Sequence, residues 1–368
     1  MFTEKHFPSS VSGEELDNYL ENAWYRMGQS IFTCHFLFFE EKLFSPIWTR
    51  LPLDGYAFRK RLRKLMGRNE QLFRTCVRPA QLDDEKEALF QVYKNNFNGR
   101  LSPTLKICLQ DNFDFNIFAT YEIAIYHGHK LVAYSFFDLG KHSLASIKGV
   151  YDPAYEKFSL GFYTMLREIQ YGQELGFKYY YPGYIVPGFP RFDYKTRIGK
   201  EEEVQYFNLK QHAWLPLTKF SQQDVPIQFL SQKLMDTGWA LTQHDIMCQI
   251  LYYPAYEANI FGYGDERFLE SPLFLNCFSN VFPRPRFIVY FDIWKEKYVF
   301  CHCMPIEDLG FYFEYSMQFD TGDARHFLDF IMKKTVIVET ENIQEIVGLA
   351  VSISKLLKPP SKMRRFLK

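Results

Sequence analysis

The chain has 368 residues, 47% of them hydrophobic and 23% charged, which predicts two or three domains with real cores and excludes a disordered protein. Lys and Arg together number 43, as do Asp and Glu, so no global charge attracts a polyanion and a nucleic-acid contact needs a local basic patch. Aromatic residues reach 18%, with 38 Phe and 25 Tyr, which predicts cores rich in aromatic rings.

The seven cysteines are scattered along the chain, which argues against a disulfide framework and fits a reducing compartment. Cys301 and Cys303 are the close pair. We interpret them as buried strand cysteines, with a metal site as the alternative. The first residues lack the form of a signal peptide, and no apolar run approaches 18 residues. The sequence therefore predicts a soluble, cytoplasmic protein with no membrane contact.

Four elements are predicted in the N-terminal part of the chain. Ser12 and Glu15 have the spacing of a capping box and predict a short helix. Residues 31–39 read as a buried strand, and residues 45–53 as an edge strand at best, because they hold two prolines. Residues 59–68 carry six cations in ten positions, the sharpest concentration of positive charge in the chain.

The middle of the chain alternates strand and helix patterns. The predicted elements are a helix at 83–95, strands at 121–126, 131–139 and 143–151, a helix at 160–175 and a strand at 178–186. Ser159 is the expected N-cap of the second helix, and Gly176 its C-cap glycine. A helix that joins two strands in this order indicates an α/β fold with a crossover in one sheet.

The C-terminal part of the chain is predicted to form a separate α+β region. Its expected elements are strands at 286–293, 298–304 and 311–317 and helices at 323–332 and 343–357. We therefore divide the chain into residues 1–80, which include the basic segment, residues 81–216 and residues 217–368.

Four segments could carry chemistry. Ser159 to Gly161 open a helix, whose free N–H groups suit a phosphate or an oxyanion, although a plain serine cap is the preferred explanation from the residues alone. The tyrosines around Gly183 either line a ligand site or fill an aromatic core. Lys195 and Arg197 follow that strand at its carboxyl end, where open α/β sheets bind ligands. The basic segment is either a nucleic-acid contact or a solvated helix face.

The segment YDPAYEKFSLGFYTMLREIQYGQELGFKYYYPGYIV, followed by DYKTR, resembles the signature of the arginyl/leucyl-tRNA–protein transferases. The N-terminal Trp24-Tyr25-Arg26-Met27-Gly28 is similar as well. The matching positions of the signature are Tyr151, Asp152, Pro153, Ser159, Leu160, Gly161, Tyr163, Leu166, Ile169, Gly176, Tyr179, Tyr181, Gly183, Tyr184, Ile185, Tyr194, Lys195 and Arg197.

The resemblance implies a GNAT-like mixed sheet with flanking helices and the transfer of an amino acid from aminoacyl-tRNA to the N-terminal α-amine of a protein, the chemistry of N-degron tagging. It implies catalytic roles for Tyr181, Tyr184, Ser159 and Gly161. It implies substrate contacts for Tyr25, Arg26, Tyr151, Asp152, Gly183, Tyr194, Lys195 and Arg197, and tRNA contacts for Arg59, Lys60, Arg61, Arg63, Lys64 and Arg68.

Aminoacyl-tRNA is then a co-substrate, and no cofactor is expected. The family's N-terminal cysteine cluster is reduced here to Cys34, so no metal is expected there. Two alternatives stay open from the residues alone. One is a non-catalytic GNAT-like binding protein. The other is an acyl-CoA N-acyltransferase, which the absence of a glycine-rich phosphate loop before the helix disfavours.

Overall fold

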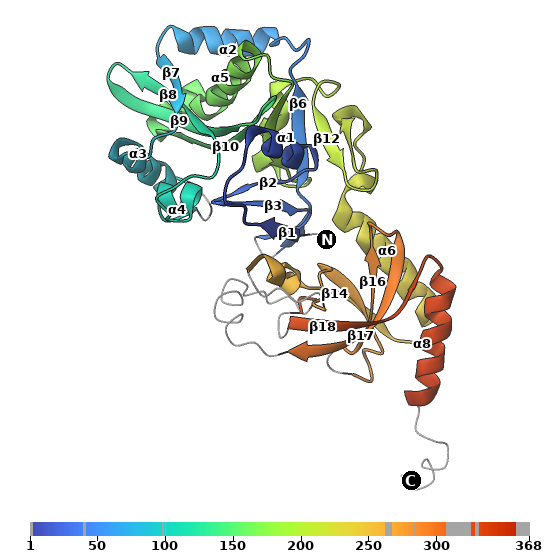
Figure 1. Ribbon diagram of the computed structural model, residues 1–368. Coiled ribbons are helices and arrows are strands. Elements are labelled where there is room, and N and C mark those ends of the chain that lie inside the picture. The colour runs from blue at the N-terminus through green and yellow to red at the C-terminus, as the bar shows by residue number, and fades with distance from the viewer. Residues whose placement is uncertain are drawn as a thin grey trace, which may run out of the picture. The chain divides into compact units, whose positions relative to one another are not determined.

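The structure is a computed structural model that describes residues 3–39, 42–97, 99, 101–261, 267–282, 285–306, 325–327 and 331–357. Two compact units make up the chain (Figure 1). The larger unit comprises Lys5–Cys34 and Pro46–Ser221, and the smaller comprises Met1–Glu4, His35–Ser45 and Gln222–Lys368. The predicted division into 1–80, 81–216 and 217–368 stays a prediction.

The larger unit alternates strands and helices along the chain. Strand β1 (Thr3–His6) leads into it. Its helices are α1 (Gly13–Glu21), α2 (Lys60–Glu70), α3 (Asp84–Asn95), α4 (Leu105–Gln110), η1 (Pro153–Phe158), α5 (Leu160–Glu174), η2 (Pro190–Ile198) and η3 (Leu217–Lys219). Its strands are β2 (Tyr25–Met27), β3 (Ser30–Cys34), β6 (Ile47–Pro52), β7 (Arg74–Pro79), β8 (Thr120–His127), β9 (Lys130–Leu139), β10 (Ser143–Tyr151), β11 (Tyr179–Ile185), β12 (Gln205–Asn208) and β13 (Ala213–Pro216).

A mixed sheet of eight strands organises this unit, in the order β13-β12-β6-β11-β10-β9-β8-β7. Strands β10 and β11, which flank α5, are parallel, and the other neighbouring pairs are antiparallel. The predicted strands at 121–126 and 131–139, which pair as β8 and β9, and the predicted strand–helix–strand segment are thus confirmed, as is the α/β (α+β) fold class with a mixed sheet and flanking helices.

Helices cover both faces of this sheet (Figure 1). Helices α2 and α5 pack on one face through residues such as Met66, Leu166 and Ile169. Helices α3 and α4 pack on the other through residues such as Phe90 and Leu109. Because both faces are covered, β9 reads as an almost continuous apolar run rather than an alternating one.

Strand β6 corrects the prediction of an edge strand at residues 45–53. It lies inside the sheet, between β12 and β11. Pro46 precedes the strand, and Pro52 is its last residue, opposite Tyr179. The prolines therefore remove no N–H group from the middle of the strand, and an interior position is tolerated.

The smaller unit is an antiparallel sheet with helices, which confirms the predicted C-terminal α+β region. The strands of its main sheet follow the order β14-β15-β16-β17-β18. Its elements are β4 (Leu37–Phe39), β5 (Lys42–Phe44), η4 (Gln222–Asp224), α6 (Pro226–Thr242), β14 (Cys248–Tyr252), η5 (Pro254–Phe261), β15 (Leu273–Cys277), β16 (Phe287–Asp292), β17 (Lys297–Ile306), β18 (Ile331–Thr340) and α8 (Ile343–Leu357).

Two predictions in this unit can be followed further. Cys301 and Cys303 are buried in β17, as the interpretation of strand cysteines requires. Met332 lies in β18 opposite Pro305, not in the predicted helix at 323–332, because strand pairing with β17 overrides the local helical spacing. The strand predicted at 311–317 lies outside the described residues. None of the helices in the described part of the chain is both long and apolar enough to cross a bilayer.

Candidate active site

The sheet splits where β10 meets β11. The two strands pair only from Ser143↔Tyr179 to Ala145↔Tyr181 within the described residues, whereas β10 continues to Tyr151 and β11 to Ile185. A bulge follows in β10 between Ser146 and Lys148, and β11 continues along β6. We call this opening the strand fork. It opens toward the carboxyl ends of two parallel strands, the usual ligand edge of an open α/β sheet.

Helix α5 begins beside the strand fork, and Ser159 does not cap it as predicted. Ser159 has left-handed backbone angles (φ 53°, ψ 45°), and its side chain makes no capping hydrogen bond. The residue also ends η1, which fixes this backbone. At Gly161 a Cβ atom would stand 3.1 Å from the Tyr151 ring. The glycine therefore lets Tyr151 lie directly on the helix start.

A cavity of about 350 Å³ opens next to Tyr151. Its lining is aromatic and polar: Tyr93, Asn96, Phe97, Tyr151, Pro153, Glu156 and Arg191. The rings of Tyr93 and Tyr151 are 5.4 Å apart, and the Arg191 guanidinium lies 5.2 Å from the centre of the Phe97 ring. The cavity thus offers one cation, one carboxylate and flat aromatic surfaces.

Tyr181 and Tyr184 lie on the same side of β11. The ladder is irregular between Tyr180 and Gly183, and Gly183 has a φ of 96° that favours glycine. Tyr25 stacks on Trp48 with 3.7 Å between the ring centres. Tyr181 meets Tyr25 edge-on at 6.2 Å, and Tyr184 meets Trp48 at 5.0 Å. The structure therefore brings together the two tyrosines that the sequence assigns to catalysis, with Tyr25 beside them.

The hydroxyls of these tyrosines are suited to donate hydrogen bonds rather than to ionise. Burial raises the pKa of Tyr184 to about 12, and burial likewise raises the pKa of Tyr181 above its ordinary value. Both side chains are therefore protonated at neutral pH. A positioned O–H donor of this kind can stabilise the oxyanion of an acyl-transfer reaction.

Lys195 lies over Gly183 and Tyr184. Its Nζ donates to the Tyr184 carbonyl at 3.1 Å and stands 4.7 Å from the centre of the Tyr184 ring. Burial lowers the pKa of Lys195 to about 8. A Cβ atom at Gly183 would come within 3.0 Å of this Nζ, which is a second reason for glycine at that position. Lys195 thus lies beside Tyr184, one of the two tyrosines that the sequence assigns to catalysis, and the predicted substrate contact of Lys195 stays a prediction.

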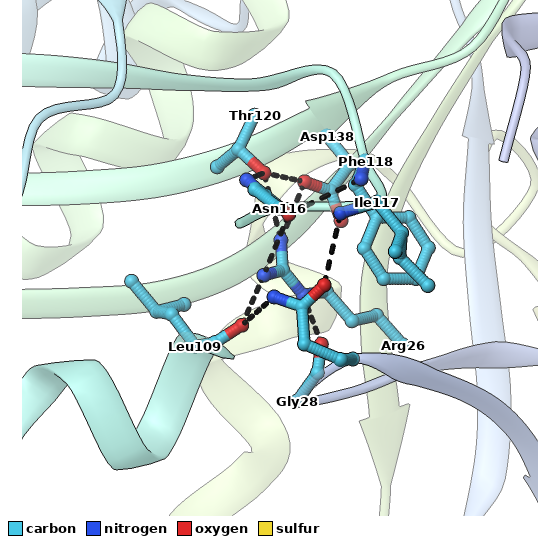
Figure 2. Close-up of polar contacts among 9 residues, drawn as sticks. Arg26, Gly28, Leu109, Asn116, Ile117, Phe118, Thr120 and Asp138 are labelled. Atoms are coloured by element: carbon cyan, nitrogen blue, oxygen red, sulfur yellow. Dashed lines mark hydrogen bonds and ion pairs between the residues drawn. The ribbon is translucent and has the colours of Figure 1, made fainter. Parts of the chain in front are cut away.

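The Arg26 side chain points into the protein interior and bonds to other residues there (Figure 2). Its Nη1 lies 2.8 Å from Asp138 Oδ1 and donates to Thr120 Oγ1 at 2.7 Å, and its Nε donates to the Gly28 carbonyl at 2.8 Å. The side chains of Arg26 and Asp138 are 1% and 0% exposed. This geometry is that of a buried structural ion pair. The predicted substrate contact of Arg26 is the one that the geometry supports least.

Asp152 also holds the fold. Its Oδ2 accepts from Lys130 Nζ at 2.7 Å, and its Oδ1 accepts from the Ala154 N–H at 3.0 Å. Partial burial raises the pKa of Asp152, but these hydrogen bonds outweigh it and leave the pKa below its ordinary value. Asp152 therefore fixes the turn between β10 and η1, which places Tyr151 and Glu156 at the cavity.

The six predicted tRNA contacts form one exposed basic surface, the basic helix face: Arg59, Lys60, Arg61, Arg63, Lys64 and Arg68. Leu62 and Met66 anchor α2 on the sheet from its opposite side. Within the described residues, none of the six cations forms an ion pair with a carboxylate. Arg59 Nη2 donates to the Arg197 carbonyl at 2.8 Å, so the exposed Arg197 extends this surface toward η2.

The sequence reasoning missed most of the cavity lining, including Tyr93, Glu156 and Arg191, and it missed Glu168 at the root of the strand fork. A signal for Glu168 is present, because Leu160, Thr164 and Glu168 follow each other at helical spacing on the buried face of α5. In the part of the chain that the structure describes, no group of three or more His, Cys, Asp or Glu side chains is placed to hold a metal ion.

Comparison with known proteins shows which proteins this part of the chain is similar to. Residues 85–205 match the sequence model of the family described as arginine-tRNA-protein transferase, C terminus. An aspartate/glutamate leucyltransferase of Leptospira interrogans is 28% identical over 194 residues, which span 51% of this chain and 74% of that protein. An aspartate/glutamate leucyltransferase of Campylobacter jejuni is 27% identical over 153 residues, which span 40% of this chain and 63% of that protein.

Among solved structures, a GCN5-related N-acetyltransferase from Anabaena variabilis aligns with a TM-score of 0.30 and 12% identity, over 55% of this chain and 43% of that one. The residues that match the family model include α5, the residues that line the cavity, and strands β10 and β11, which form the strand fork. The resemblance found in the sequence is thereby confirmed, because residues 85–205 match the family model and the relatives are named as aminoacyl transferases of the same kind.

Proposed function

We propose that this protein transfers an amino acid, arginine or leucine, from aminoacyl-tRNA to the N-terminal α-amine of an acceptor protein, and so creates an N-degron. One observation carries the proposal: the residues that match the transferase family model include the strand fork and the residues that line the cavity.

The chemistry asks little of the protein. An aminoacyl ester is already activated, and an α-amine has a pKa of about 7.7–8.0, so part of it is neutral near pH 7. The enzyme has to align amine and ester and to stabilise the oxyanion. In our proposal the hydroxyls of Tyr181 and Tyr184 and the helix start at Ser159 and Gly161 serve the oxyanion, and no cofactor takes part.

The cavity suits the reacting ends of the two substrates. Its aromatic rings offer stacking surfaces for a nucleobase or an apolar side chain. Glu156 can accept hydrogen bonds from an ammonium group, and Arg191 can donate to a carboxylate or a phosphate. We therefore propose that the aminoacyl end of the tRNA and the acceptor terminus meet here, and that Tyr194, Lys195 and Arg197 of η2 flank them.

A transfer assay tests this function. The protein is incubated with radiolabelled leucyl-tRNA or arginyl-tRNA and with peptides that begin with Asp, Glu or Ala, with an N-acetylated peptide as the control. Label on peptides with a free terminus, and none on the acetylated peptide, is expected. Absence of transfer from both tRNAs would reject the proposal. Preference for charged over uncharged tRNA without transfer would favour the binding-protein alternative, and thermal stabilisation by acetyl-CoA the acyl-CoA alternative.

The basic helix face gives a prediction for tRNA binding. Replacing Lys60 and Lys64 with alanine is expected to weaken binding and to reduce the slope of log affinity against log salt by about 2, or one unit per phosphate contact. Binding titrations at several salt concentrations measure this slope. Lys106→Ala is the matched control, because this exposed lysine on α4 pairs with Asp114. An unchanged slope in the double variant would exclude α2 from the tRNA interface.

A further inference from the structure

Glu168 is a fully buried carboxylic acid at the root of the strand fork. It projects from α5 and is 0% exposed. The Tyr180 hydroxyl donates to its Oε2 at 2.8 Å, whereas its Oε1 makes no hydrogen bond. Among the described residues, no Lys or Arg side chain pairs with it. A buried carboxylate without a cation is among the costliest groups that a core can hold.

Three neighbouring strands surround this carboxyl group. Tyr180 of β11 donates to it, and the hydroxyls of Ser135 in β9 and Ser146 in β10 lie near enough to affect its pKa, although the Ser135 hydroxyl makes no hydrogen bond. Ser146 is the first residue of β10 beyond the last pair with β11, so the carboxyl group lies where the two strands separate. The groups that face Glu168 from these strands are thus hydroxyls, and none of them is charged at neutral pH.

Tyr194 of η2 lies within electrostatic reach of both the carboxyl group and the cavity wall. The residue is 39% exposed, and partial burial, with Glu168 and Tyr184 as further influences, raises the pKa of its hydroxyl to about 12. Tyr194 in turn helps to raise the pKa of Tyr93, which lines the cavity. Tyr194 is therefore the residue of η2 that couples electrostatically to both Glu168 and the cavity wall.

Packing does not explain the carboxyl group, because a glutamine would accept the hydrogen bond of Tyr180 without a buried charge. Burial raises the pKa of Glu168 from 4.5 to about 7, although the hydroxyls of Ser135, Tyr180 and Ser146 oppose the increase. Both protonation states are therefore populated at neutral pH. An acid–base group works best when its pKa lies near the working pH.

We propose that Glu168 is a positioning residue that takes up a proton from the acceptor amine through the hydroxyls of Tyr194 and Tyr180. This inference rests on the proposed function. The α-ammonium group passes one proton to the hydroxyls, and Glu168 becomes protonated. The neutral nitrogen then forms a bond to the ester carbonyl carbon. When the bond from that carbon to the ribose oxygen breaks, the oxygen takes the second proton of the nitrogen, and Glu168 later returns its proton to water.

The test compares Glu168→Gln with the wild type in the transfer assay. The variant keeps the side-chain shape, so its thermal unfolding midpoint is expected to equal or exceed that of the wild type. Its kcat is expected to fall by about 100-fold, the lower end for removal of a general base. The increase of kcat with pH near pH 7 should disappear, while KM for the charged tRNA stays unchanged. If the wild type transfers and Glu168→Gln has the same kcat and pH profile, this inference is overturned while the proposed function stands.

Two further variants sharpen the test. Glu174→Gln removes an exposed carboxylate at the end of the same helix, and it should leave kcat and the pH profile as in the wild type. Tyr180→Phe removes a hydroxyl of the proposed route and a hydrogen bond that favours the charged form of Glu168, so kcat should fall and the pH profile should move to higher pH. A Tyr180→Phe profile that stays in place would contradict the proposed route. A wild type that transfers from neither tRNA would reject the proposed function itself, and the proton role with it.

Discussion

Replacing Arg26 with methionine is expected to lower the free energy of unfolding by about 3–5 kcal/mol, the range for removing one partner of a buried ion pair. The substitution leaves the Asp138 carboxylate buried without its cation, and the acceptors at Gly28, Leu109 and Thr120 lose a donor. Since domains are stable by only about 5–15 kcal/mol, this loss is a large share of the total. Urea unfolding followed by circular dichroism measures it.

Two comparisons decide whether the cause is the unpaired charge. The double substitution Arg26→Met with Asp138→Leu should recover part of the lost stability, because apolar residues can replace a whole buried ion pair. Arg59→Met removes an exposed arginine and should change the free energy of unfolding by less than about 0.5 kcal/mol. If Arg26→Met unfolded like the wild type but lost transfer activity, the substrate contact implied by the family would be the correct reading.

The second large effect concerns the pH dependence of stability. The folded-state pKa of Glu168 lies at about 7, above its ordinary value of 4.5. The stability that this group contributes is therefore complete below about pH 4.5 and is lost as the pH rises through 7, because the unfolded chain gives up the proton first. Relative to Glu168→Gln, the wild type should lose about 3 kcal/mol of unfolding free energy between pH 4.5 and 8.

Unfolding curves of both proteins at a series of pH values give this difference directly. Other titrating groups are common to the two proteins and cancel, so the difference isolates Glu168. Above pH 8 the two curves should run parallel. Curves that are parallel over the whole range would mean that Glu168 is already charged in acid, and its surroundings would then be more polar than the structure implies.

The sequence was sufficient for strands β8 to β11 of the sheet and for the helix beside the strand fork, because their periodicity and turn residues are local signals. It did not predict β7, β12 and β13. It was insufficient where a single residue changes the geometry. A regular strand would place Tyr181 and Tyr184 on opposite faces, but the irregularity at Gly183 puts both beside the stacked pair of Tyr25 and Trp48. Ser159 has the residue type of a cap, yet η1 fixes its backbone in a conformation without one.

The candidate site was predicted in part for a similar reason. A family signature marks the residues that vary little, but it does not separate those that face a ligand from those that hold the fold. Arg26 proves to be an internal partner of Asp138. Glu156 and Arg191 line the cavity from the short 3-10 helices η1 and η2, whose sequences carry no clear hydrophobic periodicity. Such positions depend on how η1 and η2 are placed, which is decided by tertiary contacts.

The interior position of β6 has a consequence for dissecting the protein into fragments. β6 precedes residues 85–205 in the chain, but it hydrogen-bonds to β11 on one side and to β12 on the other. A recombinant fragment cut at the borders of the family match would lose the strand that joins the fork to β12, and the exposed edge of β11 would invite aggregation. The shortest piece that can be exchanged between relatives therefore begins before β6, upstream of the residues that match the family model.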